Sequence, residues 1–495
     1  MSLLIAGMPL QSFEKLDSVV ESILRQARVP GAGLAVVAAG KALYAKGFGY
    51  RDLKRRKPLT ADTLYPIAST TKSINSTLLG MLVDDGLLEW DVPVQRYVPQ
   101  FRLYDDIFSS RVTLRDLLTM RTGLPRHDWV ALGNCATRPQ ILERLKDLEP
   151  SADFRQRFQY NNLTVTAAGH IAEIVTGKRW EDLAQQRIFR PLDMSHTTCV
   201  RPLKGNFTLS YHENAHRRLI VSTLSTAEYT APSGGAVYST VRDMARWISL
   251  NLNHGKLGRR QLIDAKTLAE IHAPQVVVGT RPLAALPRDA AYALGWLVDT
   301  YNGHQRIFHG GYLHDIASCV MLFPEVGIGL VSFANFGPVG VGELLGLHAF
   351  DALMGLEPKQ TLSDKLAAYE KAIVDTRARN ASLLPVPNTL PSRGLNAYCG
   401  TYEHPGYGRL DIRRHGSRGL ILHRGNVEVP LRHWHYDTWV SKESDRWVIH
   451  LPRPLDATSP AQFLPGPSGD IQSVAIAFEP EVAPIQFLKV PRSRR

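Results

Sequence analysis

The chain has 495 residues, 44% of them apolar, which is too long for one compact core, so we expect two or three domains. Four widely spaced cysteines without a C-x-x-C pair (Cys135, Cys199, Cys319 and Cys399) argue against a disulfide framework and a structural zinc site. The net charge is +12, but Lys and Arg are scattered rather than gathered in a stripe with aromatic residues, so we expect no nucleic-acid partner.

The sequence also argues against a membrane partner. No apolar run reaches the roughly 18 residues that a spanning helix needs. The apolar stretch at residues 3–10 is short and has no basic residues before it, so it is a weak export signal. We expect a cytoplasmic protein, although a removed export signal would leave the same sequence and a periplasmic or secreted location stays open.

Helix and strand signals alternate along the first part of the chain. Residues 13–28 carry apolar side chains at helical spacing, and the apolar runs 33–38 and 42–49 then predict a β-hairpin. A second helical pattern covers 69–86. A turn-rich middle follows, with helices predicted near 113–121, 138–148, 161–177 and 240–253. Strand signals return before a helical stretch at 340–354, and they cover 292–300, 305–308, 317–323 and 327–333.

The early hairpin and the late strands predict one mainly antiparallel sheet built from both ends of this region. Each group alone would expose unpaired edges, so the two groups are expected to pair. The helices between them would cover the sheet and form a helical subdomain. This is an α+β fold rather than an alternating βαβ fold.

The C-terminal part has a different pattern. Residues 380–393 are rich in proline and predict a linker between a first domain (1–379) and a second domain (394–495). The second domain is expected to be an all-β barrel or sandwich. Its strands are predicted at 409–413, 419–423, 427–431, 447–451, 474–478 and 485–490.

Ser69 and Lys72 begin the second predicted helix, where positions i and i+3 share a face. A serine hydroxyl needs a base before it can act as a nucleophile. A buried lysine can lose its charge through desolvation and serve as that base. The motif is short, and we interpret a second copy, Ser12-Phe-Glu-Lys15, as a helix N-cap with a surface lysine.

Tyr160-Asn-Asn162 is the only Tyr-x-Asn sequence in the chain and comes about 90 residues later. A tyrosine beside a neutral lysine can relay protons to a leaving group. Asn162 could orient the lysine and bind a substrate amide. Taken alone, such residues more often form the turn before a helix, here the one at 161–177.

His309-Gly-Gly311 ends a predicted strand. Two glycines let a ligand approach the backbone closely. Similar His and Gly pairs occur at His254, His404 and His423, so only the place of this motif after the other two gives it weight.

One sequence points to a rival chemistry. His212-Glu-Asn-Ala-His216 fits the H-E-x-x-H zinc pattern, which needs both histidines on one helical face and a third ligand. The flanking residues show no helical periodicity. We therefore expect a polar loop here, with no metal and no cofactor.

Taken in order, these motifs resemble the serine hydrolases related to class C β-lactamases and penicillin-binding proteins. The likeness covers roughly residues 13–355 and includes the segments Thr63–Lys72, Leu117–Pro125, Phe158–Asn162, Pro191–Met194, Ser233–Gly235 with Asp243, and Leu294–Trp296. The C-terminal part resembles the lipocalin-like barrel appended to some peptidases of this family, through Tyr398–Tyr402, His404–Gly408 and His433–Asp437.

The resemblance implies a role for each catalytic position. Ser69 would be the acyl-accepting nucleophile and Lys72 its base. Tyr160 would be the second proton-transfer group, and Asn162 would orient the lysine. The oxyanion hole would be formed by the backbone N–H groups of Ser69 and Tyr312.

The third motif departs from the family pattern. His309 takes the place of lysine in the family's Lys-Thr-Gly motif, and Gly310 takes the place of threonine, while Gly311 is retained. His309 and Gly311 would therefore bind and orient the substrate. A neutral imidazole is a poorer carboxylate anchor than lysine, so we expect little β-lactamase or DD-carboxypeptidase activity. His-x-Gly is familiar in the family's D-aminopeptidases.

The sequence therefore predicts a serine hydrolase that forms an acyl-enzyme on Ser69 and cleaves amide bonds of small peptides, including peptides with D-residues. An esterase or transacylase using the same site is the main alternative. A β-lactamase and a non-catalytic binding protein are further alternatives. The expected partners are a small peptide, amide or ester substrate and, as an open option, further copies of the chain.

Overall fold

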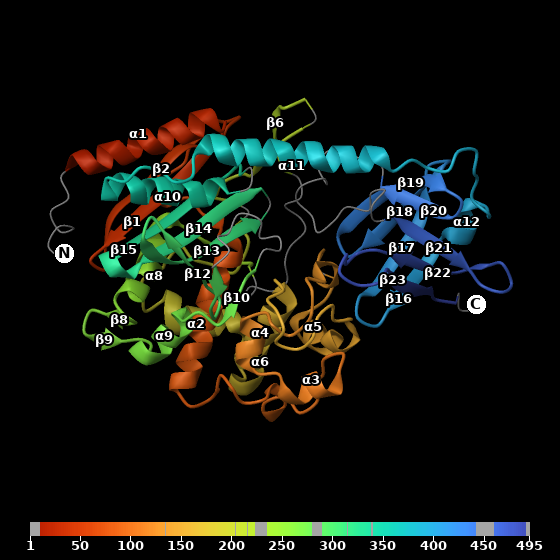
Figure 1. Ribbon diagram of the computed structural model, residues 1–495, viewed down its shortest axis with the longest axis horizontal. Helices are drawn as coiled ribbons and strands as arrows, with labels where there is room; N and C mark the ends of the chain where they lie inside the picture. The colour runs from red at the N-terminus through yellow and green to blue at the C-terminus, as the bar shows by residue number, and fades with distance from the viewer. Residues whose placement is uncertain are drawn as a thin grey trace.

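The computed structural model describes residues 10–133, 135–202, 204–214, 216–222, 235–279, 290–313, 315–337, 340–441 and 460–491. Figure 1 shows a helix-and-sheet region on the left and a barrel on the right. The helix α11 (Leu362–Ser382) runs along the top of the molecule from the first part toward the second.

A nine-stranded antiparallel sheet forms the centre of the first part, and its strand order is β10-β11-β12-β13-β14-β15-β1-β2-β3. The strands from the N-terminal side are β1 (Gly31–Ala38), β2 (Lys41–Asp52) and β3 (Lys57–Pro58). Those from the other side are β10 (Val276–Val277), β11 (Ala291–Tyr292), β12 (Leu297–Tyr301), β13 (His304–Leu313), β14 (Ile316–Phe323) and β15 (Ile328–Ala334). β1 pairs with β15 from Ala32 opposite Ala334 to Ala38 opposite Ile328, which confirms the predicted sheet built from both ends.

Helices cover both faces of this sheet (Figure 1). α8 (Val241–Leu252) packs on one face, where a Cβ on Gly329 would lie 2.2 Å from a methyl carbon of Ile248, so only glycine allows the helix this close. α10 (Val341–Met354) packs on the opposite face and carries α1 (Leu10–Gln26) on its outer side. This layering is the α+β architecture that the sequence predicts.

The helical subdomain lies below the sheet in Figure 1. Its helices are α2 (Thr71–Asp84), α3 (Asp106–Arg111), α4 (Leu114–Leu118), α5 (Arg138–Arg144), α6 (Asn162–Thr176) and α7 (Trp180–Ala184), and α9 (Ala265–His272) packs against α2. Short strand pairs complete the first part: β4 (Tyr65–Pro66) with β7 (Tyr238–Ser239), β5 (Tyr211–Glu213) with β6 (Leu219–Val221), and β8 (Lys256–Leu257) with β9 (Arg260–Gln261).

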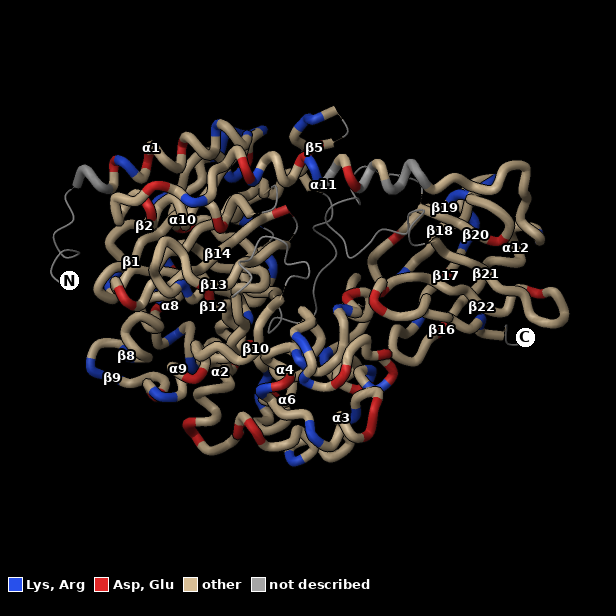
Figure 2. The backbone as a smooth tube through the Cα atoms, in the orientation of Figure 1, with Lys and Arg blue, Asp and Glu red and all other residues tan. Residues whose placement is uncertain are grey.

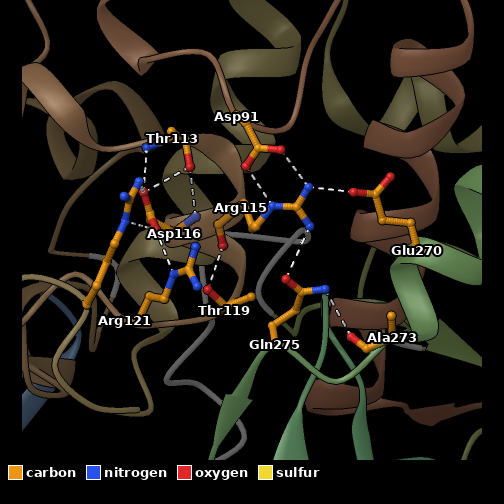
Figure 3. Close-up of polar contacts among 10 residues, drawn as sticks. Asp91, Thr113, Arg115, Asp116, Thr119, Arg121, Glu270, Ala273 and Gln275 are labelled. Carbon is orange, nitrogen blue, oxygen red and sulfur yellow. Dashed lines mark hydrogen bonds and ion pairs between the residues drawn. The ribbon is translucent and has the colours of Figure 1, made fainter.

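A polar network around α4 ties the helical subdomain to the rest of the first part (Figure 3). Arg115 donates two hydrogen bonds of 2.7 Å to Asp91 and one of 2.5 Å to Glu270 of α9. Asp116 follows Arg115 in α4, and its buried carboxylate accepts hydrogen bonds from Arg121 at 2.7 Å and from Arg155 at 2.7 and 2.8 Å. These contacts fix the segment that leads from α4 toward residue 126.

The C-terminal part is a closed eight-stranded barrel, which confirms the all-β prediction. Its strands are β16 (Gly400–His404), β17 (Gly408–His415), β18 (Gly419–Arg424), β19 (Val427–His435), β20 (Thr438–Ser441), β21 (Ala461–Pro465), β22 (Ile471–Ile476) and β23 (Ile485–Lys489), preceded by α12 (Leu395–Tyr398). β16 pairs with β23 and closes the barrel, so each of the described barrel strands has a partner on both sides. The strand predicted at 447–451 lies outside the described residues.

The region between the two parts is more helical than the sequence pattern indicates. α11 was not predicted, although Thr361 and Asp364 form a capping box at its start. The helix continues to Ser382, and residues 383–394 contain neither helix nor strand. The exact domain boundaries at 379 and 394 stay a prediction.

Two local predictions were wrong. α1 begins at Leu10, so Ser12 lies inside the helix rather than at its N-cap. His212 and Glu213 lie in β5, which pairs with β6, so this part of the segment is a strand rather than a polar loop, whereas Asn214 and His216 lie outside the two strands.

Figure 2 shows basic and acidic residues interleaved over both parts of the molecule. The helices that the structure describes include none that is long and apolar enough to cross a membrane.

Candidate active site

Ser69 lies in a 3₁₀ turn, Ala68–Thr70, directly before α2. Ala68 has a left-handed backbone with φ of 51°, which a residue with a side chain adopts at a cost of about 1 kcal/mol. The turn is held by two hydroxyl donors: Thr70 to the Ile67 carbonyl at 2.7 Å and Thr71 to the Ala68 carbonyl at 2.6 Å. The nucleophile candidate is therefore fixed by a strained, well-bonded turn.

β13 and β14 pack directly against this turn. Ser318 of β14 donates a 2.8 Å hydrogen bond to the Ile67 carbonyl. A Cβ on Gly311 would lie 2.5 Å from the same carbonyl oxygen, so Gly311 is needed for the approach of β13 to the Ser69 turn rather than for the approach of a ligand. A Cβ on Gly310 would meet only one atom within 4 Å, the Ser318 carbonyl oxygen at 3.9 Å, and so the outer side of Gly310 is open.

Lys72 and Tyr160 both reach the Ser69 hydroxyl. Lys72 Nζ lies 3.0 Å from Ser69 Oγ, as the i, i+3 spacing on the first turn of α2 predicts. The Tyr160 hydroxyl lies 2.7 Å from the same oxygen, and Lys72 Nζ sits 4.9 Å from the centre of the Tyr160 ring. The structure therefore brings together the three residues that the sequence singles out.

Lys72 is completely buried. Burial lowers its pKa below the ordinary value, and the nearby Arg126 acts in the same direction, while Tyr160 and Asp128 oppose it. The lowered pKa increases the fraction of neutral amine that can accept a proton from Ser69.

Asn162 connects this group to two residues that sequence reasoning missed. Lys72 Nζ lies 2.7 Å from Asn162 Oδ1, and Asn162 Nδ2 donates to Asp128 Oδ1 at 3.0 Å. Arg126 Nε lies 2.6 Å from the other Asp128 oxygen, and its guanidinium stands 4.9 Å from the Tyr160 ring centre. The available signal was the pair of charged residues that follows Pro125. Asn161 caps α6 through a 2.9 Å bond from Thr164 N, so the motif also forms the turn before that helix.

The donor and acceptor of each hydrogen bond in this group can be assigned consistently. The Asp128 carboxylate only accepts hydrogen bonds, so Asn162 must present Nδ2 to it and Oδ1 to Lys72. A neutral Lys72 can donate an N–H to Oδ1 and keep its lone pair for the Ser69 hydroxyl. Tyr160 can then donate to Ser69 Oγ. The arrangement can therefore remove the serine proton and supply a second proton donor beside it.

His309 is buried between two internal partners. Its Nδ1 lies 2.6 Å from the Gly310 carbonyl oxygen, which only accepts, so Nδ1 carries the proton. Its Nε2 then accepts from the Tyr292 hydroxyl at 3.0 Å. Burial, with a smaller effect from Lys72, lowers the pKa of His309 to about 3. His309 therefore brings no positive charge to the site at neutral pH.

Tyr312 follows the glycines in β13, and its hydroxyl donates to Asp315 at 2.9 Å. β13 pairs with β12 only as far as Phe308, opposite Leu297, whereas its pairing with β14 continues to Leu313. Within the described strands, β14 is therefore the only strand that pairs with residues 309–313.

The structure does not support the rival zinc site. His212 is buried, with Nδ1 3.7 Å from Asp315, while His216 is exposed beyond the strand. In the parts of the chain that are described, no three His, Cys, Asp or Glu side chains are grouped so that they could hold a metal ion.

The segment Ser233–Gly235 is part of the family resemblance in the sequence. Its residues Ser233 and Gly234 lie outside the described residues.

Comparison with known proteins shows which family this chain belongs to. Residues 16–349 match the family model described as Beta-lactamase. The chain belongs to the Beta-lactamase family. Residues 384–489, which include the barrel, match a model described as a domain of unknown function (DUF3471). The predicted relation to β-lactamases and penicillin-binding proteins is confirmed, and this family member is an enzyme, a serine hydrolase.

The similar proteins cover between 72% and 96% of this chain. "Unguisins hydrolase ungD'" of Aspergillus campestris (strain IBT 28561) is 27% identical over 96% of this chain and 91% of its own length. "Protein flp" of Staphylococcus aureus (strain MRSA252) is 27% identical over 72% of this chain and 70% of its own length. The octameric penicillin-binding protein homologue from Pyrococcus abyssi has the same fold, with a TM-score of 0.62 and 20% identity over 96% of this chain and 100% of its own.

Proposed function

We propose that this Beta-lactamase family member cleaves amide bonds of small peptides through an acyl-enzyme on Ser69. The observation that carries the proposal is the placement of Lys72 Nζ and the Tyr160 hydroxyl at 3.0 and 2.7 Å from Ser69 Oγ. In the acylation step, Ser69 Oγ attacks the substrate carbonyl carbon while Lys72 takes the hydroxyl proton. The carbonyl π electrons move onto the oxygen, and a tetrahedral intermediate forms.

Collapse of this intermediate needs a proton on the leaving nitrogen. Tyr160 lies beside both Ser69 and Lys72, so we assign this proton transfer to Tyr160. The phenol donates its proton to the leaving nitrogen, and Lys72 then gives the phenol the proton that it took from Ser69. The amine leaves and the acyl group stays on Ser69. Water, deprotonated by the same pair, attacks the ester carbon and releases the acid with Ser69 restored.

We assign the oxyanion hole to the backbone N–H groups of Ser69 and Tyr312. The left-handed Ala68 and the close packing of Gly311 on the Ile67 carbonyl support this assignment, because they hold the Ser69 turn against β13. Each such donor is worth about 3 kcal/mol of transition-state stabilisation.

The neutral His309 supports a substrate without a carboxylate at this end of the site. An anionic substrate would need a cationic partner there, and the imidazole has both nitrogens bonded to Tyr292 and Gly310. Small peptides whose cleaved bond lies away from a free carboxyl group, including peptides with D-residues, fit this site better than β-lactams. The name of the Aspergillus campestris relative, a hydrolase of unguisins, is compatible with this class.

An esterase or transacylase would use the same group of residues. Esters need less protonation of the leaving group than amides, so Tyr160→Phe should spare ester turnover if esters are the true substrates. A comparison of p-nitroanilides of L- and D-amino acids with p-nitrophenyl esters, each tested on both proteins, separates the two activities. Comparable losses of kcat/KM on amides and esters would remove this distinction between the two activities.

A fluorophosphonate probe tests the proposal itself. The probe should label the wild-type protein on Ser69, and Ser69→Ala should remove the label. Equal labelling of both proteins, or no labelling of the wild type, would contradict the assignment of Ser69 as the nucleophile.

A further inference from the structure

Residues 126–133 form a loop that carries Asp128 toward the active site and also enters the contact with the barrel. We propose that the barrel is a positioning element of this active site: its residues Tyr407, Arg424 and Glu479 hold the 126–133 loop so that Asp128 can orient Asn162. This inference rests on the proposed function of Ser69 and adds a role for the second domain. Figure 1 shows the barrel beside α5, the helix that follows the loop.

His127 is the first point of contact. Its backbone is left-handed, with φ of 46°, and its side chain is buried. The buried Glu479 of the barrel accepts a 2.8 Å hydrogen bond from the His127 backbone N–H. A strained residue persists only where its surroundings determine it strongly. Here a barrel carboxylate holds the residue that directly precedes Asp128.

The His127 ring is bonded on both sides. Nε2 lies 2.9 Å from the Glu149 carbonyl oxygen, which only accepts, so Nε2 carries the proton. Nδ1 must then accept from the Tyr407 hydroxyl at 2.7 Å. Burial lowers the pKa of His127 to about 4, so this arrangement of donors holds at neutral pH. The barrel therefore fixes both the backbone and the ring of His127.

Arg424 provides the second contact. Arg424 is 1% exposed as a residue. Its guanidinium donates to the Trp129 carbonyl oxygen at 2.8 and 3.1 Å, and to the carbonyl oxygens of Tyr407 and Arg409 at 2.5 and 3.3 Å. Among the described residues it has no carboxylate partner. A buried charge is costly unless it is bonded, so the Trp129 carbonyl is part of what makes this position acceptable for arginine.

The loop also packs into the barrel along its length. The Trp129 ring stacks on Phe478 with 4.4 Å between ring centres. At the far end, the Asn426 N–H donates to the Gly133 carbonyl at 3.0 Å. Contacts on both sides of Asp128 therefore come from the barrel, and the loop cannot move without breaking them.

A continuous set of contacts thus joins the barrel to the nucleophile. It runs from Tyr407 and Glu479 through His127 to Asp128, and then through Asn162 and Lys72 to Ser69. A displaced Asp128 would release the Asn162 amide, which could then turn and present a donor to Lys72. The Lys72 lone pair would no longer be directed at Ser69, so the acylation rate would fall while substrate contacts stayed unchanged.

Matched phenol variants test the inference in the full-length protein, with p-nitrophenyl acetate as the probe substrate. Tyr407→Phe removes one hydroxyl that bonds to His127, and should lower kcat about five-fold with KM changed less than about two-fold. Tyr402→Phe is the control. It removes a hydroxyl of an equally buried tyrosine that donates a 2.7 Å hydrogen bond to the Tyr398 carbonyl oxygen, away from the 126–133 loop, and it should leave kcat unchanged. Glu479→Ala should lower kcat, and Glu479→Gln should restore it, because Gln retains an acceptor for the His127 N–H.

A double-mutant cycle separates positioning from a general loss of stability. In an Asp128→Asn background the His127 contacts no longer have a carboxylate to position, so Tyr407→Phe should lower kcat no further. Equal losses in both backgrounds would overturn the inference, as would equal effects of Tyr407→Phe and Tyr402→Phe. Arg424→Met should act like Tyr407→Phe but more strongly, by about 100-fold, provided that it still folds by circular dichroism.

The outcomes also separate this inference from the proposed function. If fluorophosphonate labels wild-type Ser69 but its labelling rate is the same in Tyr407→Phe and Glu479→Ala, the serine mechanism stands and the barrel's positioning role is overturned. If the wild-type protein is not labelled at Ser69, the proposed function fails, and the inference that rests on it fails too.

Discussion

At the scale of single residues, the proposed mechanism makes Lys72 the group that sets the pH range in which Ser69 reacts. Burial lowers its pKa from the ordinary value of 10.5, and the neutral amine is the active form. The sign follows directly: kcat/KM should rise as pH increases through the lowered pKa, and its half-maximal point should lie below pH 10.5. A pH profile of p-nitrophenyl acetate hydrolysis, corrected for the spontaneous reaction, measures this point. Activity that began to rise only above the ordinary lysine pKa would contradict a neutral Lys72.

His309 gives a second prediction at this scale. It is uncharged well above its pKa of about 3, so it cannot form an ion pair with a substrate carboxylate at neutral pH. A charged hydrogen bond contributes about 1.5–3 kcal/mol, so substrates that depend on such an anchor should react about 10–100-fold more slowly than neutral ones. Matched p-nitroanilides with a free or an amidated carboxyl group, with nitrocefin alongside, measure the difference. A preference for the free acid would show that another cation serves as the anchor.

At the residue scale, the grouping of side chains around Ser69 was predictable from the sequence, but the residues that support Asn162 were not. Ser69, Lys72, Tyr160 and Asn162 were predicted from three short motifs in order, and hydrogen bonds in the structure link Tyr160 to Ser69, Ser69 to Lys72, and Lys72 to Asn162. Asp128 was missed because its position depends on the left-handed His127 and on barrel contacts more than 270 residues away in sequence. No local pattern encodes such contacts.

At the scale of elements, the approach of β13 to the Ser69 turn depends on Gly311. An added methyl group at this position would meet the Ile67 carbonyl oxygen at 2.5 Å, which is backbone and cannot turn away. Gly311→Ala should therefore displace the turn and lower kcat about 100-fold. Gly310→Ala is the matched control, since its methyl group would meet only one atom, at 3.9 Å, and the variant should retain activity on p-nitrophenyl acetate within about three-fold. Similar losses in both variants would count against this role of Gly311.

The polar network around α4 gives a second prediction at this scale (Figure 3). Burial would raise the pKa of Asp116, but the hydrogen bonds from Arg155 and Arg121 outweigh burial and lower it. Its stabilising contribution is therefore present above the unfolded pKa of an aspartate and is lost as pH falls through the lowered folded value. Asp116→Asn should reduce the free energy of unfolding by about 3 kcal/mol in urea titrations at neutral pH.

The control for this variant is Asp182→Asn, which removes an exposed ion pair with Arg179. It should leave the urea midpoint unchanged, because surface pairs contribute little. Equal shifts of the midpoint in both variants would show that burial of Asp116 does not matter.

Elements were otherwise predicted well where apolar periodicity was strong, as in α6 and α8, and missed where it was weak. α11 has a mixed pattern, and its capping box at Thr361 was the one readable signal.

At the scale of the whole molecule, the pairing of distant segments was predictable but the docking of the two parts was not. β1 and β15 had to pair because neither could leave its edges exposed, and all eight β1 residues are buried. The position of the barrel follows from single contacts, such as those of Arg424 with Trp129, which no periodicity indicates. The two parts are therefore joined by buried contacts that the sequence does not indicate.

The most direct measurement is the site and rate of acylation during turnover. The protein is mixed rapidly with p-nitrophenyl acetate, quenched with acid, digested and analysed by mass spectrometry. The account predicts a transient acetyl group on the peptide that contains Ser69, formed in the wild type and absent in Ser69→Ala, with formation much slower in Lys72→Met. Turnover without any acetyl group on Ser69, or an acetyl group that forms equally fast in Lys72→Met, would contradict the proposal that Lys72 activates Ser69.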